Sequence, residues 1–517
     1  MLISVGEQMY PPIDRGALAL RYPGRPNFEQ IASAFEVAIA EGHLRTGERL
    51  PTVRQLSTEL GMSGATIVAA YNLLNRGGWT RGEVGRGTFV VGVPERSAQA
   101  APSTVPTPSA QGTWVATRQP PPWRRRALLT SAARLRATYP QALDCTSGKP
   151  DVALLPFELL QSSWHAAIAA TTRADLQYAG PEPLPTLQRE LLPRLAAEGV
   201  PARAGDLVVG SSAQQFIVLA VTLAGLLDSA IRPIIAVEEP GYQTAIDTFE
   251  RVGCRVIGVA IDEQGAIPAA LDAVLTRGAH VAFFIPRVQN PTGASWSVRR
   301  RKELADVLAA HPSVVAIEDD QFAGIATARP GSLLTDPRLE DRVIYIRSFA
   351  KAIAPDLRLA VAVARPRIRA MLAEAKTFAD GWSSRLAQRA LANALADPAL
   401  DAALDVARAE YARRRIATLD ALNARLVPSG GWATGADGLN LWIQLPPGVD
   451  AVEVIERAAA RGVLVAPGEP FYIRPGHADV VRLSIGVLAD HDPATIAAMI
   501  TSAALETAAD RNTAMSV

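Results

Sequence analysis

The sequence predicts an α/β protein of more than one domain, in which a small helical domain precedes a large domain built on a mostly parallel sheet. Its 517 residues are about three to four times the usual length of one domain. Hydrophobic residues make up 49% and charged residues 20%, which excludes a chain that is disordered or fibrous as a whole. Residues 94–122 are rich in proline, serine and threonine with little apolar periodicity, which is typical of a linker.

The residues before the linker predict three helices followed by a hairpin. Apolar residues recur at helical spacing over residues 28–41. Thr52 and the glutamine three residues later form a capping box, which predicts a second helix that ends at Leu60. A third helix is expected over residues 63–76, and the glycine-rich residues 77–91 predict a hairpin with a basic tip. A short turn between two helices is the geometry that places the second of them in a DNA major groove, and the hairpin would then be a wing.

After the linker, apolar runs of strand length are separated by helical stretches. The runs begin at Leu207, Ile234, Val281, Val314 and Val343. Strands that alternate with helices are typical of a parallel sheet with helices on its faces. The alternation therefore predicts an α/β domain.

Short polar segments follow several of these strands. Gly210–Gln215 opens an apolar helix, so its backbone N–H groups are placed where the N-terminus of a helix holds an anion. Ser348–Lys351 puts a hydroxyl and an amine on one loop, and a second cation, Arg358, follows it. Asn290 and Asp319 end two further strand regions. Because the chain contains only four lysines, any chemistry that needs a primary amine has four candidates.

Several exact motifs in the first domain identify a known arrangement. They are Gly47–Arg54, Leu60–Ser63 and Gly85–Phe89, together with Thr66, Ala70, Tyr71 and Leu74. In their order they resemble the winged helix-turn-helix of the GntR family of bacterial regulators, over roughly residues 26 to 92. The resemblance implies double-stranded DNA at a promoter or operator as a partner. The residues that it implies for DNA contact are Arg54, Ser63, Thr66 and Arg86, with Gly87 letting the wing approach a groove.

The second domain carries an asparagine, an aspartate and a lysine in a specific order. Asp319 follows Asn290 by 29 residues, and Lys351 follows Asp319 by 32. Together with the other motifs this order resembles the fold-type-I, aspartate-aminotransferase-like enzymes, which use pyridoxal 5'-phosphate as cofactor. By this resemblance Lys351 is the catalytic residue and would form a Schiff base with the aldehyde. Asp319 would keep the pyridine nitrogen protonated, Asn290 would donate to the ring 3-oxygen, and Tyr242 would contact the ring.

The same resemblance implies residues for the phosphate and for a substrate. The phosphate would be held by Ser212, Ala213, Ser348 and Arg358. Tyr178 resembles the tyrosine that reaches the phosphate of the neighbouring subunit, which implies a homodimer. Arg482 resembles the arginine that binds a substrate carboxylate.

Gln321 departs from the family pattern. Family members usually carry a tyrosine at this position, two residues after the ring aspartate, where it also donates to the 3-oxygen. An amide can donate there without the proton affinity of a phenol, and a hydrogen bond to a charged group is worth roughly 1.5 to 3 kcal/mol. Together with changes at Gly180 and Pro183 after Tyr178, Gln321 favours sensing over turnover. Asn440 stands where a histidine is common.

A winged helix, a linker and an aminotransferase-like domain in this order resemble the MocR subfamily of GntR regulators over nearly the whole chain. This implies a transcriptional regulator whose large domain dimerises and senses a ligand. Two effectors fit: pyridoxal phosphate itself, or an amino compound that forms an aldimine with the cofactor held at Lys351. The alternative is a functional pyridoxal-phosphate-dependent aminotransferase whose N-terminal domain does not bind DNA.

The expected domain boundaries follow from these segments. We expect an N-terminal extension over 1–25, the GntR-type domain over 26–93, the linker over 94–122, the aminotransferase-like domain over 123–507 and a tail over 508–517. Two distant cysteines and scattered histidines support neither a disulfide framework nor a metal site. The longest apolar run, Phe216–Leu227, is too short to span a membrane. A cytoplasmic protein is therefore expected.

Overall fold

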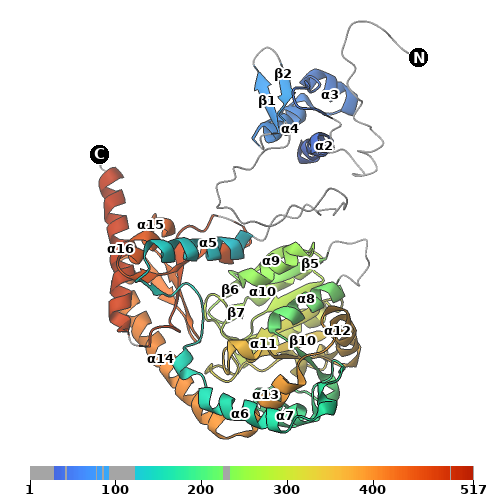
Figure 1. The fold of residues 1–517 in the computed structure, drawn as a ribbon. Helices are drawn as coiled ribbons and strands as arrows, with labels where there is room; N and C mark the ends of the chain where they lie inside the picture. Colours follow the sequence, from blue (N-terminus) through green and yellow to red (C-terminus); the bar gives the residue numbers. More distant parts are fainter. Residues whose placement is uncertain are drawn as a thin grey trace, which may run out of the picture. The chain divides into compact units, whose positions relative to one another are not determined.

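The computed structural model of the protein divides into two compact units, Met1–Val115 and Ala116–Val517 (Figure 1). It describes residues 28–40, 44–76, 79–83, 87–91, 123–224, 233–474, 476–489 and 491–515. The expected N-terminal extension, the linker and Arg86 lie outside these described residues.

The first unit contains the three predicted helices, α2 (Phe28–Ala40), α3 (Val53–Leu60) and α4 (Gly64–Arg76). Thr52 and the glutamine at the third position of α3 form both bonds of the predicted capping box. Gly61 ends α3 with φ 64°, a left-handed conformation that glycine adopts without a steric penalty. The local signals in the sequence therefore predicted α3 and the start of α4 correctly.

A two-stranded antiparallel sheet completes the first unit. Strand β1 (Thr80–Glu83) pairs with β2 (Gly87–Val90), as expected for the wing. The turn between them lies outside the described residues. One apolar core joins the helices and β2; its fully buried members include Ile31, Phe35, Leu50, Leu56, Ile67, Leu74 and Val90.

The second unit is built on an eight-stranded sheet in the order β4-β11-β10-β9-β8-β5-β6-β7. The five strands from β10 to β6 in this order run parallel, as predicted, and β11, β4 and β7 pair antiparallel with their neighbours. The strands are β4 (Leu207–Gly210), β5 (Ile234–Glu239), β6 (Arg255–Asp262), β7 (Gly265–Ala266), β8 (Val281–Phe284), β9 (Val315–Asp320), β10 (Val343–Ser348) and β11 (Ala360–Val363).

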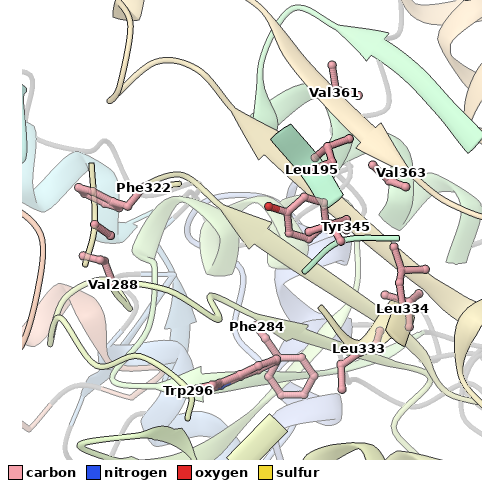
Figure 2. Packing of buried hydrophobic residues seen from close by; sticks show 14 of the residues in the cluster. Leu195, Phe284, Val288, Trp296, Phe322, Leu333, Leu334, Tyr345, Val361 and Val363 are labelled. Atoms are coloured by element: carbon pink, nitrogen blue, oxygen red, sulfur yellow. The ribbon is translucent and has the colours of Figure 1, made fainter. Parts of the chain in front are cut away.

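Helices cover this sheet and enclose apolar clusters on its two sides. One cluster includes residues of α7 and α11, and Figure 2 shows Phe284 and Trp296 meeting edge to face there, with ring centroids 5.3 Å apart. The other cluster includes residues of α8, α9 and α12. The helices are α6 (Phe157–Ala169), α7 (Pro185–Ala197), α8 (Ala213–Ala224), α9 (Gln243–Arg251), α10 (Pro268–Leu275), α11 (Val298–Ala310), α12 (Pro366–Ala379) and α13 (Arg385–Ala396).

The long helix α14 (Ala399–Leu426) leads from these helices to a second, smaller sheet in the order β12-β13-β16-β15. Its strands are β12 (Trp432–Thr434), β13 (Asn440–Gln444), β15 (Ala466–Pro467) and β16 (Val480–Ser484). A separate pair joins β3 (Leu143–Asp144) to β14 (Val463–Leu464). The helices α5 (Trp123–Thr138), α15 (Ala451–Ala460) and α16 (Pro493–Met515) complete this part.

Two details of this part bear on the expected boundaries. Helix α5 begins at Trp123, where the large domain was expected to start. Helix α16 continues to Met515, so most of the residues expected as a tail from residue 508 are helical. Alanines of α16 pack into the same apolar cluster as Leu422 of α14, and the helix extends beyond this contact.

The connecting segments contain short 3₁₀ helices. They are η1 (Val152–Leu154), η2 (Arg173–Leu176), η3 (Ala204–Asp206), η4 (Leu333–Thr335), η5 (Glu340–Arg342), η6 (Pro355–Leu357), η7 (Val427–Ser429) and η8 (Glu469–Phe471). No helix within the described ranges is both long and apolar enough to cross a membrane.

Candidate functional site

Two of the residues predicted to meet DNA, Ser63 and Thr66, lie at the turn between α3 and α4, whereas Arg54 lies in the first turn of α3. Ser63 precedes α4, and its hydroxyl accepts a hydrogen bond from the Thr66 backbone N–H at 3.2 Å. The two hydroxyls are 2.8 Å apart and bond to each other. Ser63 and Arg54 are exposed and Thr66 is half-buried. Two hydroxyl groups therefore lie at the N-terminus of α4, where the second helix of such a motif approaches DNA.

Gly87 has a structural role that the sequence did not reveal. Its φ of 118° favours glycine, and an added Cβ would lie 2.5 Å from the Nε atom of Arg49. Arg49 forms a backbone bridge to Phe89 of β2. The backbone conformation thus favours glycine here, and a larger residue would also displace the Arg49 guanidinium from the wing strand.

Helix α4 also presents residues that the motif comparison missed. Ala65, Val68 and Asn72 are exposed, and 44% of the Val68 surface is accessible. Their spacing of three and four residues puts them on one face of α4. This periodicity is visible in the sequence once α4 is identified as the second helix of the motif.

The second unit holds a cavity of about 540 Å³ around Lys351. Most of the residues predicted for the cofactor line it, and a face of α5 closes one side. The lining includes Arg125, Leu128, Leu129, Ala132, Arg136, Thr146, Ser147, Lys149, Ser212, Ala213, Gln214, Tyr242, Gln243, Thr244, Gln321, Ser348, Ala350, Lys351, Arg358 and Arg482.

Lys351 has the properties of a reactive amine. It follows β10, and its Nζ donates to the carbonyl oxygen of Gly148. Burial, and secondarily the charge of Arg482, lower the pKa of Lys351 to about 8. A larger share of this amine is therefore neutral and nucleophilic near pH 7 than for an ordinary lysine.

The other three lysines are poorer candidates for amine chemistry. Lys302 is exposed on α11 and pairs with an aspartate at 3.0 Å. Lys376 is fully buried in α12 and pairs with Asp380 at 2.6 Å. Lys149 lines the cavity with Lys351 but is exposed. The structure thus singles out Lys351 among the four.

Asp319 is a buried carboxylate with one oxygen left without a partner. It lies at the end of β9, its Oδ2 accepts from the Gln321 side-chain amide at 2.6 Å, and its Oδ1 has no hydrogen bond. Burial raises the pKa of Asp319 to about 7. The amide of Gln321 is thus engaged with Asp319, whereas the sequence comparison placed it where a donor to the ring 3-oxygen is usual.

Arg482 lies in β16 and is almost fully buried. Its Nη2 donates to the Thr146 carbonyl at 2.7 Å, and its Nη1 donates to Oδ1 of Asn290 at 3.2 Å. The guanidinium carbon stands 4.7 Å from the ring centroid of Phe471. Burial lowers the pKa of Arg482 to about 10, and its Nε has no partner. Arg482 therefore retains an unused donor in the cavity wall, beside the Asn290 side chain.

One end of the cavity is suited to an anion. Ser212 and Ala213 lie at the N-terminus of α8, where backbone N–H groups lack partners within the helix. Ser348 and Arg358 line the same cavity, and Arg358 has a positive φ of 51°. The four residues predicted for a phosphate are thus brought to one cavity.

Tyr242 and Tyr178 are placed very differently. Tyr242 lines the cavity at the start of α9, and burial raises the pKa of its phenol. Tyr178 is 84% exposed, packs edge to face on Trp382 at 5.3 Å, and lines a separate cavity with Arg385. Within one chain the fold does not bring Tyr178 to Lys351.

The sequence missed the part of the cavity wall that comes from α5 and from residues 146–149. Arg125 and Arg136 of α5 precede Lys351 by more than 200 residues, and no spacing rule links them to it. Within the described ranges, no three or more histidine, cysteine, aspartate or glutamate side chains are grouped as a metal site.

The family model for aminotransferase classes I and II matches residues 147–502, so the chain belongs to this family. A second model, for the gntR family of bacterial regulatory proteins, matches residues 27–90. The protein is therefore a GntR-type domain fused to an aminotransferase domain, the domain order of the MocR subfamily, as the sequence predicted.

Regulators and an aminotransferase are among its relatives. The chain is 28% identical to the vitamin B6 salvage pathway transcriptional repressor PtsJ of Salmonella typhimurium (strain LT2), over 91% of this chain and 97% of PtsJ. It is 28% identical to the HTH-type transcriptional regulator TauR of Rhodobacter capsulatus, over 84% of this chain and 87% of TauR. The solved structure of LysN, the alpha-aminoadipate aminotransferase of Thermus thermophilus complexed with N-(5'-phosphopyridoxyl)-L-leucine, has a TM-score of 0.65. It is 27% identical and covers 75% of this chain and 97% of LysN.

Proposed function

We propose that this protein is a transcriptional regulator that binds DNA through its first unit and binds pyridoxal phosphate in the Lys351 cavity of its second unit. The observation that carries the proposal is that a chain with a GntR-type domain holds a buried amine of lowered pKa, Lys351, and a buried carboxylate with one unpartnered oxygen, Asp319. PtsJ, a relative over nearly the whole chain, is named as a repressor of vitamin B6 salvage.

The cavity residues fit pyridoxal phosphate at both of its ends. The free Oδ1 of Asp319 lacks a donor, which a protonated pyridine nitrogen would supply. Ser212, Ser348 and Arg358 would hold the phosphate, together with the N–H groups that begin α8. When bound, pyridoxal phosphate supplies an aldehyde that reacts with a primary amine and a ring that withdraws electrons.

Each remaining side chain of the site has a definite task in this proposal. Lys351 would be the amine that holds the cofactor, and its lowered pKa makes the neutral form of that amine available near pH 7. Tyr242 would pack against the ring, and the side-chain amide of Asn290 would donate to the 3-oxygen while its Oδ1 accepts from Arg482. Gln321 would keep one oxygen of Asp319 occupied, leaving the other for the ring nitrogen.

The effector is either pyridoxal phosphate itself or an amine that reacts at the bound cofactor. Arg482 favours an amine that carries a carboxylate, because its unpartnered Nε could donate to such a group. If Arg482→Ala leaves the ligand response unchanged, the carboxylated effector is excluded.

We propose further that the protein acts as a homodimer. Large apolar side chains are exposed in η1, α6 and η2, namely Val152 at 79%, Phe157 at 64% and Leu176 at 74%, and in the loop after η2, namely Tyr178 at 84%. Exposed apolar clusters favour a protein interface. Two DNA-binding units would double the number of phosphate contacts and strengthen the binding of a palindromic operator.

The second candidate function is transamination. It is favoured by Lys351 and Arg482, which line the cavity, and by Asn290 and Asp319, which are hydrogen-bonded to the lining residues Arg482 and Gln321. The hydrogen bond of Gln321 to Asp319 disfavours it, since no phenol stands there to tune the ring oxygen. Sustained keto-acid formation from a panel of amino acids at about 1 per second or faster would support the enzyme and exclude a pure regulator.

The decisive experiment measures fluorescence anisotropy of DNA from upstream of the protein's own gene, with and without pyridoxal phosphate. We expect specific binding that changes with the cofactor, loss of the change in Lys351→Ala, and a normal change in the control Lys302→Ala, since Lys302 is exposed on α11. If the protein binds DNA without sequence specificity both with and without pyridoxal phosphate, the aminotransferase function is favoured instead.

A further inference from the structure

Helix α5 is the first described element after the segment 92–122, and one of its faces lines the Lys351 cavity. The residues on this face are Arg125, Leu128, Leu129, Ala132 and Arg136. Their spacing of three and four residues is that of a single helical stripe. Any ligand that fills the cavity therefore meets the helix to which the segment 92–122 is covalently joined.

The N-terminus of α5 is held by the buried side chain of Arg124 and by the backbone N–H of Arg125, which donates to Asp247 at 2.8 Å. Only 1% of the Arg124 surface is exposed, and every N–H donor of its guanidinium has an acceptor. Nη1 donates to Asp247 at 3.2 Å and to Glu250 at 2.6 Å. Nε donates to the Tyr472 carbonyl at 2.9 Å and Nη2 to the Ile473 carbonyl at 2.6 Å. Arg124 thus joins α5 to α9 and to the residues that follow η8.

The two segments that Arg124 joins to α5, namely α9 and the residues around η8, lie next to residues of the cavity. Helix α9 begins directly after Tyr242. Phe471 of η8 accepts from the backbone N–H of Gly241 at 2.8 Å and lies against the guanidinium of Arg482. Tyr242, proposed for the ring, and Arg482, proposed for a carboxylate, are therefore linked to the start of α5 through hydrogen bonds and packed side chains.

We propose that α5 carries the occupancy of the Lys351 cavity to the segment 92–122, and that Arg124 is the positioning residue that makes this coupling possible. The inference rests on the proposed function and adds the path by which a ligand in the cavity affects DNA binding. A ligand shifts the equilibrium between two conformations of a protein only if it binds them with different affinity. Because Arg124 ties α5 to α9 and η8, a ligand that moves either of them moves the start of α5 as well.

The test compares Arg124→Lys with Arg126→Lys in the full-length protein. Lysine keeps the charge but cannot reproduce a planar fork that serves four partners. Arg126 is the matched control, since it lies on the same helix, is exposed and does not line the cavity. Each variant is measured for its affinity for pyridoxal phosphate by absorbance titration and for its DNA affinity with and without the cofactor.

We expect the ratio of the two DNA affinities in the wild type to lie in the usual range for allosteric coupling, about 5- to 150-fold. In Arg124→Lys the ratio should fall close to one while pyridoxal phosphate still binds. In Arg126→Lys it should equal the wild-type ratio. If Arg124→Lys does not fold, Glu250→Gln removes the charge of the more exposed partner, and the same loss of coupling is expected.

Hydrogen exchange of the α5 amides in the wild type, with and without pyridoxal phosphate and without DNA, tests the route independently. Slower exchange with the cofactor is expected. Unchanged exchange, or a wild-type ratio in Arg124→Lys, would overturn the inference. If the wild type binds DNA equally in both states, the proposed function fails instead, and the exchange of α5 still decides whether occupancy reaches this helix.

Discussion

The lowered pKa of Lys351 leads to a quantitative prediction about how fast the protein takes up pyridoxal phosphate. With a pKa of about 8, about one amine in eleven is neutral at pH 7, against about one in three thousand at the ordinary pKa of 10.5. Burial and the charge of Arg482 thus increase the neutral, reactive fraction about 300-fold. The rate of condensation should rise with pH and level off near the pKa of Lys351.

The substitution Arg482→Ala tests the contribution of Arg482 to the pKa of Lys351. Removing a like charge and admitting water both favour the protonated amine, so the pKa of Lys351 should rise from about 8 toward its ordinary value. Each unit lowers the neutral fraction tenfold at pH 7. Stopped-flow absorbance of the reaction between protein and pyridoxal phosphate, from about pH 6 to about pH 10, measures the midpoint directly.

Arg255→Ala is the matched control, because Arg255 is an exposed arginine on β6 outside the cavity, and its removal should leave the midpoint unchanged. A wild-type midpoint near the ordinary lysine value of 10.5 would refute the effect of burial. An unchanged or lower midpoint in Arg482→Ala would refute the effect of its charge.

Three further predictions concern other residues. Asp319→Asn should weaken the binding of pyridoxal phosphate in an absorbance titration, because the free carboxylate oxygen is lost; equal affinity would contradict the assignment. Gly87→Ala should cost the first unit about 1 kcal/mol or more, through its positive φ and the contact with Arg49, and should weaken DNA binding in anisotropy; unchanged binding would contradict this. Burial raises the pKa of Glu238 to about 8, so its contribution to stability is full below about pH 4.5 and is lost as the pH rises through 8. Glu238→Gln should flatten the dependence of the denaturation midpoint on pH in this window, and an unchanged slope would contradict it.

Some elements follow directly from the sequence because their signals are local. Helix α3 has the predicted bounds, since the capping box at Thr52 and the left-handed glycine at its end act within one turn of the chain. The apolar runs beginning at Leu207 and Val343 became β4 and β10, since a continuous run of this length is stable when buried in a sheet. The short strand β11 was not predicted, although it lies between them in the sheet.

The functional residues divide in the same way. Lys351, Asp319 and Ser212 could be named from sequence because their motifs, each at or after the end of a strand, resemble those of the fold-type-I aminotransferase-like enzymes. The sequence shows that Gln321 departs from the family pattern, which usually has a tyrosine at this position. Its hydrogen bond to Asp319, however, depends on a side-chain conformation that no spacing encodes.

The sequence by itself determined the two kinds of domain and the order of the residues around Lys351, because caps, strand runs and motif spacings are local properties of the chain. Only the tertiary structure decided that α5 forms a wall of the cavity, that Arg124 joins it to α9, and that Tyr178 lies apart from Lys351. These contacts join residues more than 100 positions apart, and they depend on how whole helices and sheets pack against each other.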